Sequence, residues 1–127
     1  MGLYLRKKKG KNKMEFIKKE KAEFYSGDGY SGMDYPSTDK DINFAVIKIN
    51  SRSPKTGFQV NTNCKELLYI INGNGIMYIK DSDEKINFNQ GDVILINKNE
   101  CYAFDGNFEA AVPCTPAWTS EQHKYVD

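Results

Sequence analysis

Residues 66–75, Glu-Leu-Leu-Tyr-Ile-Ile-Asn-Gly-Asn-Gly, constrain the fold more than any other stretch of this chain. Residues 66–71 are apolar on both faces of an extended strand apart from Glu66, which predicts a strand covered on both sides. Two Asn-Gly steps follow, and both residue types tolerate the positive φ angles of two-residue hairpin turns. We therefore expect a tight hairpin at residues 72–75, a second arm at residues 76–80, and a Glu66 side chain that points inward.

From residue 41 onward the chain reads as a series of short strands. Runs of β-branched, aromatic or alternating residues occur at residues 42–49, 57–61, 76–80, 85–88, 93–96, 101–104 and 108–112. Turn signals separate them at intervals of roughly 8–12 residues, a spacing typical of an all-β sandwich or barrel. After Pro113 and Pro116, Thr119 or Ser120 can cap a short helix over residues 121–126. Trp118 is expected to anchor that helix against the barrel.

The first 13 residues differ in charge from the rest of the chain. They hold six Lys or Arg and no acid, whereas the remainder holds 12 basic and 17 acidic residues. We expect a disordered basic tail or a non-native extension. The codons for Lys-Gly-Lys-Asn-Lys would resemble a bacterial ribosome-binding site, so Met14 is the expected start. No aromatic residues are interleaved with this charge, which argues against nucleic acid as a partner.

Residues 14–40 are predicted to be an N-terminal arm and loop that precede the barrel domain of residues 41–127. They contain Gly-x-Gly-x-x-Gly at Gly27, Gly29 and Gly32. A phosphate-binding fingerprint of this kind needs a strand before it and a helix after it. Pro36 instead continues a loop, so the glycines are interpreted as loop residues.

Composition also bears on the compartment. No apolar run approaches the roughly 20 residues that a membrane span needs, which predicts no membrane contact. The basic N-terminus is not followed by the apolar segment of a secretory signal. The cysteines Cys64, Cys101 and Cys114 are odd in number and lack CxxC spacing, which suits a reducing cytoplasm. We therefore expect a cytoplasmic protein.

Two motifs resemble those of the cupin superfamily, whose members are double-stranded β-helix (jelly-roll) barrels. Glu66 and Gly73 have the spacing of the first cupin motif. Gly91 opens the second motif, in which Tyr102 occupies the position of the usual His. The likeness covers residues 41–112, and the sequence after Cys114 is similar to the tail of small single-domain bacterial cupins. The resemblance implies a jelly-roll barrel, with the short C-terminal helix added.

Cupin metal sites usually combine two His, a Glu and the His of the second motif. The resemblance assigns these positions to Gln59, Asn61, Glu66 and Tyr102, so every imidazole is replaced. Amide and phenol oxygens are poor ligands for transition metals. We therefore predict no metal and no other cofactor. Cys64 and Cys101 lie near this region and could offer thiolate, or they could be small apolar fillers.

The resemblance also suggests an acid–base reading. Metal-free sugar epimerases of this superfamily use a His–Asp pair, but the only histidine here, His123, is predicted to lie in the terminal helix with a surface or packing role. Burial should raise the pKa of Glu66 and make it a possible general base, with Tyr102 as proton donor. In the simpler alternative the two side chains hydrogen-bond to one another and close a polar pocket.

The sequence thus predicts a cupin that binds a small polar metabolite, a sugar or sugar phosphate, without a transition metal. Polar groups mixed with aromatic walls are typical of such sites. The candidate ligand-binding residues are Gln59, Asn61, Glu66, Tyr78, Tyr102, Phe104 and Trp118. A metal-independent isomerase or epimerase that uses Glu66 and Tyr102, and an interaction module without a ligand, remain alternatives. The resemblance also implies a homodimer formed through a sheet edge.

Overall fold

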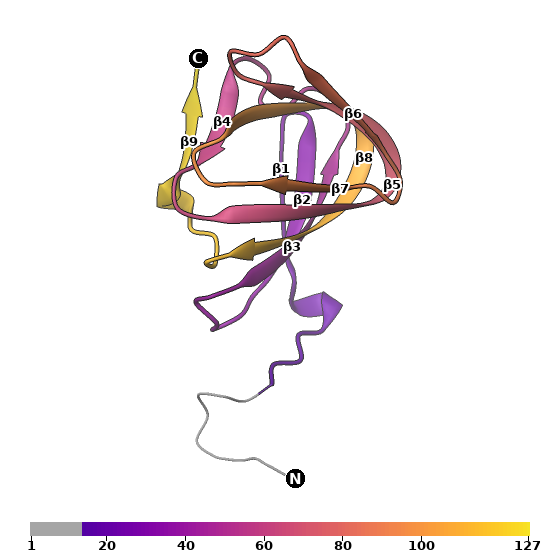
Figure 1. Ribbon diagram of the computed structural model, residues 1–127. Coiled ribbons are helices and arrows are strands. Elements are labelled where there is room, and N and C mark those ends of the chain that lie inside the picture. The colour runs from indigo at the N-terminus through magenta and orange to yellow at the C-terminus, as the bar shows by residue number, and fades with distance from the viewer. Residues whose placement is uncertain (1–13) are drawn as a thin grey trace.

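The structure is a computed structural model that describes residues 14–127, so the predictions about the basic tail and the start at Met14 fall outside the described residues. Within that range the chain is mostly strand with almost no helix, and no helix in it is long and apolar enough to cross a membrane. The elements, shown in Figure 1, are η1 (Lys19–Lys21), β1 (Glu23–Gly27), β2 (Tyr30–Tyr35), β3 (Asn43–Ile49), β4 (Phe58–Asn61), β5 (Lys65–Ile79), β6 (Lys85–Asn89), β7 (Val93–Ile96), β8 (Cys101–Thr115), η2 (Ser120–Gln122) and β9 (His123–Val126).

One curled sheet forms a half-barrel, in agreement with the predicted all-β class. Its strands follow the order β1-β2-β3-β8-β4-β9, and β5 joins this path through β8. β6 and β7 pair with β5. Figure 1 shows the strands wrapping around a common interior, with β4 and β9 on one side and the curved β5 and β8 on the other.

β5 and β8 are the longest strands, and they pair antiparallel from end to end. Gly75 and Gly106 are partners in this ladder. A Cβ atom on Gly106 would lie 2.6 Å from the Gly75 Cα, and Gly106 has a φ of 121°. Only glycine meets both conditions, the close approach of two backbones and the positive φ. The pair therefore allows the two long strands to curve together.

The hairpin predicted at residues 72–75 is wrong, because these residues belong to one continuous strand, β5. Residues 72–76 pair with residues 105–109 of β8, after a shift in register between Ile70 and Asn72. Gly73 has a φ of 83°. An Asn-Gly step that permits positive φ serves an irregular, bent strand as well as a turn. The turn signal between the runs at residues 101–104 and 108–112 likewise lies within β8.

The inner face of β5 is buried and the outer face is exposed. Leu68 and Ile70 belong to the core, and Glu66 shares their face as predicted. Leu67, Tyr69 and Ile71 are 39, 48 and 37% exposed, so the prediction of a strand covered on both sides is wrong. Nothing in residues 14–127 packs over this outer face of the sheet. On β8 the buried inner residues are Tyr102, Phe104, Phe108, Ala110, Val112 and Cys114.

Within the segment of residues 14–40, which was expected to be an N-terminal arm and loop, residues 23–35 form a β-hairpin. β1 pairs with β2, and β2 pairs with β3, so the hairpin extends the main sheet. Gly29 has a φ of 86° in the turn. Gly27 and Gly32 face Tyr30 and Tyr25 across the ladder, and a Cβ atom on either glycine would collide with its tyrosine ring. Gly29 therefore permits the turn, and Gly27 and Gly32 leave room for the rings of the two tyrosines.

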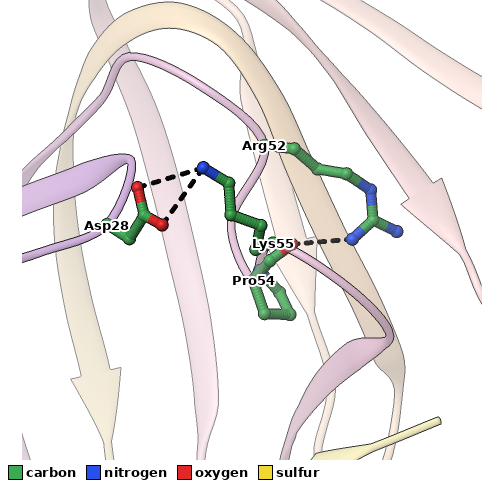
Figure 2. A network of polar contacts seen from close by, with 4 residues as sticks. All are labelled: Asp28, Arg52, Pro54 and Lys55. Carbon is green, nitrogen blue, oxygen red and sulfur yellow. Dashed lines mark hydrogen bonds and ion pairs between the residues drawn. The ribbon is translucent and has the colours of Figure 1, made fainter.

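Polar contacts link the β1–β2 turn to the loop of residues 51–56. Figure 2 shows Lys55 Nζ contacting both carboxylate oxygens of Asp28, at 3.2 and 3.1 Å. Arg52 Nη1 donates to the carbonyl oxygen of Pro54 over 2.6 Å in the same loop. The ion pair is exposed, so it contributes about 0–1 kcal/mol and assists the packing of this loop without determining it.

The helix predicted over residues 121–126 is wrong. η2 is a single turn, and the residues after it form β9, which pairs antiparallel with β4. A helix of six residues is marginal on its own, whereas a strand on the open edge of β4 gains a ladder of backbone hydrogen bonds. The pairing places His123 opposite Asn61.

Candidate functional site

A cavity of about 500 Å³ lies on the inner side of the curled sheet. Side chains from β1, β2, β3, β4, β5, β8 and β9 form its wall, together with the loops that carry Ser53 and Trp118. Ser53 is held there by paired backbone hydrogen bonds with Phe104, at 2.8 and 2.9 Å. A cavity of this size suits one small organic ligand.

Aromatic rings make up much of the wall. Tyr102 and Phe104 contact each other edge to face, with ring centroids 5.3 Å apart. Rings of this kind offer flat apolar faces against which a planar ligand can stack. The aromatic lining residues are Phe24, Tyr25, Tyr30, Phe44, Tyr102, Phe104, Trp118 and Tyr125.

Three carboxyl side chains lie in the wall of the cavity. Glu23, Asp34 and Glu66 line the cavity, and no Lys or Arg of residues 14–127 does so. Burial raises the pKa of Asp34, and the nearby Glu23 raises it further. A hydrogen bond from Tyr25 partly offsets these effects. The cavity therefore disfavours additional negative charge.

Glu66 and Tyr102 meet in this cavity. Glu66 begins the inner row of β5, and the Tyr102 hydroxyl donates to Glu66 Oε1 over 3.3 Å. Burial raises the pKa of the Glu66 carboxyl, and hydrogen bonds from Tyr102 and Asn61 oppose the rise. Burial also raises the pKa of Tyr102 well above its usual value, and the Glu66 charge adds to this. Tyr102 therefore keeps its proton and remains a hydrogen-bond donor, and Glu66 is the member of the pair that titrates.

Asn61 lies behind the wall and holds three other side chains. Its Oδ1 accepts from Trp118 Nε1 at 3.1 Å and from Gln122 Nε2 at 2.9 Å, and His123 Nδ1 lies 2.8 Å away. Asn61 is only 2% exposed. The Asn61 side chain also lowers the pKa of the Glu66 carboxyl, and its buried Nδ2 has no hydrogen-bond partner within residues 14–127. Asn61 thus connects the C-terminal segment to the acid.

The structure brings five of the seven predicted ligand-binding residues together. Asn61 stands outside the lining, as described above. Tyr78 also lies apart from the cavity, where Arg52 and Lys85 are 5.6 and 5.8 Å from its ring. The five residues that line the cavity are Gln59, Glu66, Tyr102, Phe104 and Trp118. Their contact with a ligand remains a prediction.

Sequence reasoning missed several residues of this wall. His123 was given a surface or packing role, but β9 carries it into the lining, where burial lowers its pKa. Tyr25, Tyr30 and Asp34 come from the segment interpreted as an arm and loop. The two tyrosines could have been found from a hairpin register that places Tyr25 opposite Gly32 and Tyr30 opposite Gly27, because a large ring commonly packs over a glycine on the neighbouring strand. Tyr125 follows His123 at the strand period of two.

The residues at the usual cupin metal positions do not fit a transition-metal centre. The Asn61 oxygen is already engaged by three side chains, and Tyr102 donates its proton to Glu66. Residues 14–127 contain no group of three or more His, Cys, Asp or Glu that could hold a metal ion. Cys64 and Cys114 are buried free thiols that lie against each other, and burial raises the pKa of both. Cys101 is half-buried and free.

Comparison with known proteins supports the fold. No protein-family model and no curated protein matches the sequence. Among solved structures, Streptomyces Pac13, a nucleoside dehydratase, matches in a uridine complex with a TM-score of 0.79 and 18% identity over 90% of this chain and 91% of that chain. KdgF from Halomonas sp. matches with a TM-score of 0.67 and 11% identity over 86% and 99%. Ectoine synthase from P. lautus matches with a TM-score of 0.64 and 13% identity over 82% and 80%.

These solved structures are cupin-fold proteins, so the chain has the fold of the cupin superfamily. The cupin fold and a cavity large enough for one small molecule are therefore the two established features of the site.

Proposed function

We propose that this cupin binds a small, polar, uncharged ligand that contains a flat ring, such as a nucleoside or a free sugar. One observation carries the proposal: the aromatic cavity presents the hydrogen-bonded pair of Glu66 and Tyr102 to whatever occupies it. Rings supply apolar contact, and the few polar groups fix the orientation of the ligand. Gln59 would add a further hydrogen bond from β4.

The charges of the wall narrow the ligand class predicted from sequence. A sugar phosphate would enter beside Glu23, Asp34 and Glu66, with no cation among the lining residues of 14–127 to pair with it. Removing a phosphate from water without such a partner is costly. An unphosphorylated ligand therefore fits better than the sugar phosphate.

A nucleoside is the first probe to use. The similar Pac13 structure is a complex with uridine, and a pyrimidine ring could stack on the aromatic wall here. Trp118 and the tyrosines offer both a stacking face and a polar edge. The ribose hydroxyls would then meet the Glu66 and Tyr102 pair.

The test compares uridine with uridine monophosphate in a thermal-shift measurement, because a ligand that binds the native state raises the melting temperature. We expect uridine to raise it, uridine monophosphate to raise it less, and Phe104→Ala to weaken the response. Ile42→Ser, at an exposed site outside the lining, is the matched control. A larger response to the phosphate than to uridine, or none to any nucleoside or sugar, would contradict the proposal. The second outcome would favour an interaction module without a ligand.

A second candidate function is metal-independent acid–base catalysis, either isomerisation or epimerisation of a sugar or loss of water from a nucleoside. The raised pKa of Glu66 beside the Tyr102 donor favours it, because such reactions remove one proton and deliver another. Conversion of a bound probe that stops in Glu66→Gln, while the variant still folds and binds, would establish this function.

We also propose a homodimer. The expected edge pairing is supported by β7, which within the described chain pairs only with β5 and leaves its other edge open. The adjoining outer face is apolar, with Leu67 opposite Leu95 and Tyr69 opposite Val93, all exposed. A second copy could cover the edge and this face together. The free thiols of the described cysteines support the proposed cytoplasmic location.

A further inference from the structure

The side-chain amide of Asn61 has a fixed orientation. The indole Nε1 of Trp118 can only donate a hydrogen bond, so the Asn61 atom that it contacts at 3.1 Å must be the carbonyl oxygen. Gln122 Nε2 donates to the same oxygen, while Gln122 Oε1 accepts from the backbone nitrogen of Asn63 at 3.0 Å. Both amides are therefore oriented by partners whose roles are unambiguous.

This orientation determines the tautomer of His123. Its Nδ1 lies 2.8 Å from the Asn61 oxygen, which has no proton to give, so Nδ1 must carry the proton and donate it. In the neutral ring Nε2 then keeps its lone pair. Burial lowers the pKa of His123, which favours that neutral form at pH 7. Within residues 14–127 Nε2 makes no hydrogen bond, and the ring lines the cavity.

We infer that His123 is a second acid–base group of the cavity, held by Asn61 with Nδ1 protonated so that Nε2 accepts a hydrogen bond or a proton from the ligand. This inference rests on the proposed function, because it concerns the same cavity. It also selects ligands, since the occupant must bring an O–H or N–H donor to Nε2. Asn61 acts as a positioning residue and does not touch the ligand.

The same amide links the two acid–base groups. Asn61 Oδ1 accepts the hydrogen bond from His123 Nδ1, and the same side chain lowers the pKa of Glu66. Burial raises the pKa of Glu66, which favours its protonated form, and lowers the pKa of His123, which favours the neutral imidazole. A protonated carboxyl and a neutral imidazole can serve as donor and acceptor around one ligand.

The first test is the tautomer itself, read by long-range ¹H–¹⁵N correlation on the untagged full chain at pH 7.5. The chain has a single histidine, so the two imidazole nitrogens need no further assignment. We expect a protonated Nδ1 and an unprotonated Nε2. The opposite tautomer, or an imidazolium at this pH, would overturn the inference. Asn61→Asp should raise the pKa of His123, because a carboxylate favours imidazolium; Lys124→Gln, at an exposed site on the same strand, is the control. An unchanged pKa in Asn61→Asp would remove the positioning role.

The second test uses diethyl pyrocarbonate, which acylates an unprotonated imidazole nitrogen. We expect one modification at His123 in the folded protein, found by mass spectrometry of the peptide that contains it, with uridine slowing the reaction. A histidine that reacts only after denaturation would overturn the inference, even if Asn61→Asp does not fold. If His123 reacts but uridine gives no protection, the accessible base stands and the proposed nucleoside ligand is the part that fails.

Discussion

The Tyr102 hydroxyl donates to Glu66 Oε1 over 3.3 Å, from the start of β8 to the start of β5. The two side chains come from positions 36 residues apart that the curled sheet brings onto one inner surface. Glu66 is buried, and no Lys or Arg of residues 14–127 lines the cavity beside it, so its protonated form is favoured over the ionised form. This relationship has consequences for stability that can be measured without a ligand.

Replacing Glu66 with Gln should change how stability depends on pH. Because the pKa of Glu66 is raised in the folded state above its ordinary value of 4.5, the unfolded chain loses this proton first as pH rises. The cost of ionisation is absent below pH 4.5 and complete above the folded pKa. Glu66→Gln should therefore gain stability relative to the wild type at pH 8, compared with their difference at pH 4. Urea unfolding at both values measures this, and an equal difference at the two pH values would contradict it.

Tyr102→Phe removes the donor and keeps the ring. The pKa of Glu66 should rise further, because the hydrogen bond from Tyr102 lowers it in the native protein. The variant should also lose about 0.5–1.5 kcal/mol of stability, the usual value of one hydrogen bond. Carboxyl-carbon NMR follows the titration of Glu66. Tyr78→Phe, whose ring lies outside the cavity lining, is the control. A Glu66 pKa that does not change in Tyr102→Phe would show that the contact is not made in solution.

Gly106→Ala should be far more damaging than Gly91→Ala. Both glycines have positive φ, 121° and 90°, but a Cβ at Gly91 meets nothing within 4 Å. The Gly91 variant should lose about 1–2 kcal/mol from backbone strain alone. The Gly106 variant adds a collision with the Gly75 backbone and should lose several kcal/mol or fail to fold. Equal losses of unfolding free energy in the two variants would show that the β5 and β8 backbones do not approach closely at Gly75 and Gly106.

Leu95→Glu should shift the protein from dimer to monomer. Leu95 lies on the exposed apolar face of β7, 54% exposed, and a charge there would be buried in the proposed dimer. Sedimentation velocity measures the change, and Ile42→Glu, at an exposed apolar site before β3, is the control. A wild-type protein that sediments as a monomer across the concentration range would end the homodimer proposal.

The sequence pattern was sufficient for the class of fold and for the inward position of Glu66. Alternation along a strand places residues of one parity on one face, so Glu66 follows Leu68 and Ile70 into the interior. The pattern could not distinguish a hairpin from a bent strand at residues 72–75. Both require positive φ at glycine, and the pairing with β8, far along the chain, selects the bent strand.

The rest of the site depends on pairing between distant strands. His123 enters the cavity wall because β9 pairs with β4, and Asp34 does so because β2 pairs with β3. No local sequence motif around either residue indicates which strand it pairs with. Thr119 and Ser120 gave a local signal for a helix cap before residues 121–126, but the pairing of β9 with β4 overrode it. Asn61 accepts from three side chains that lie 57 to 62 residues further along the chain, so its role is visible only in the folded structure.

The most direct test of the ligand-binding account uses Trp118, the only tryptophan in the chain and a lining residue whose indole nitrogen is fixed on Asn61. A ¹H–¹⁵N titration with uridine follows one indole cross-peak. The account predicts a saturable shift of that peak, with a weaker response to uridine monophosphate. An indole peak that stays in place through a full series of nucleosides and free sugars would contradict it.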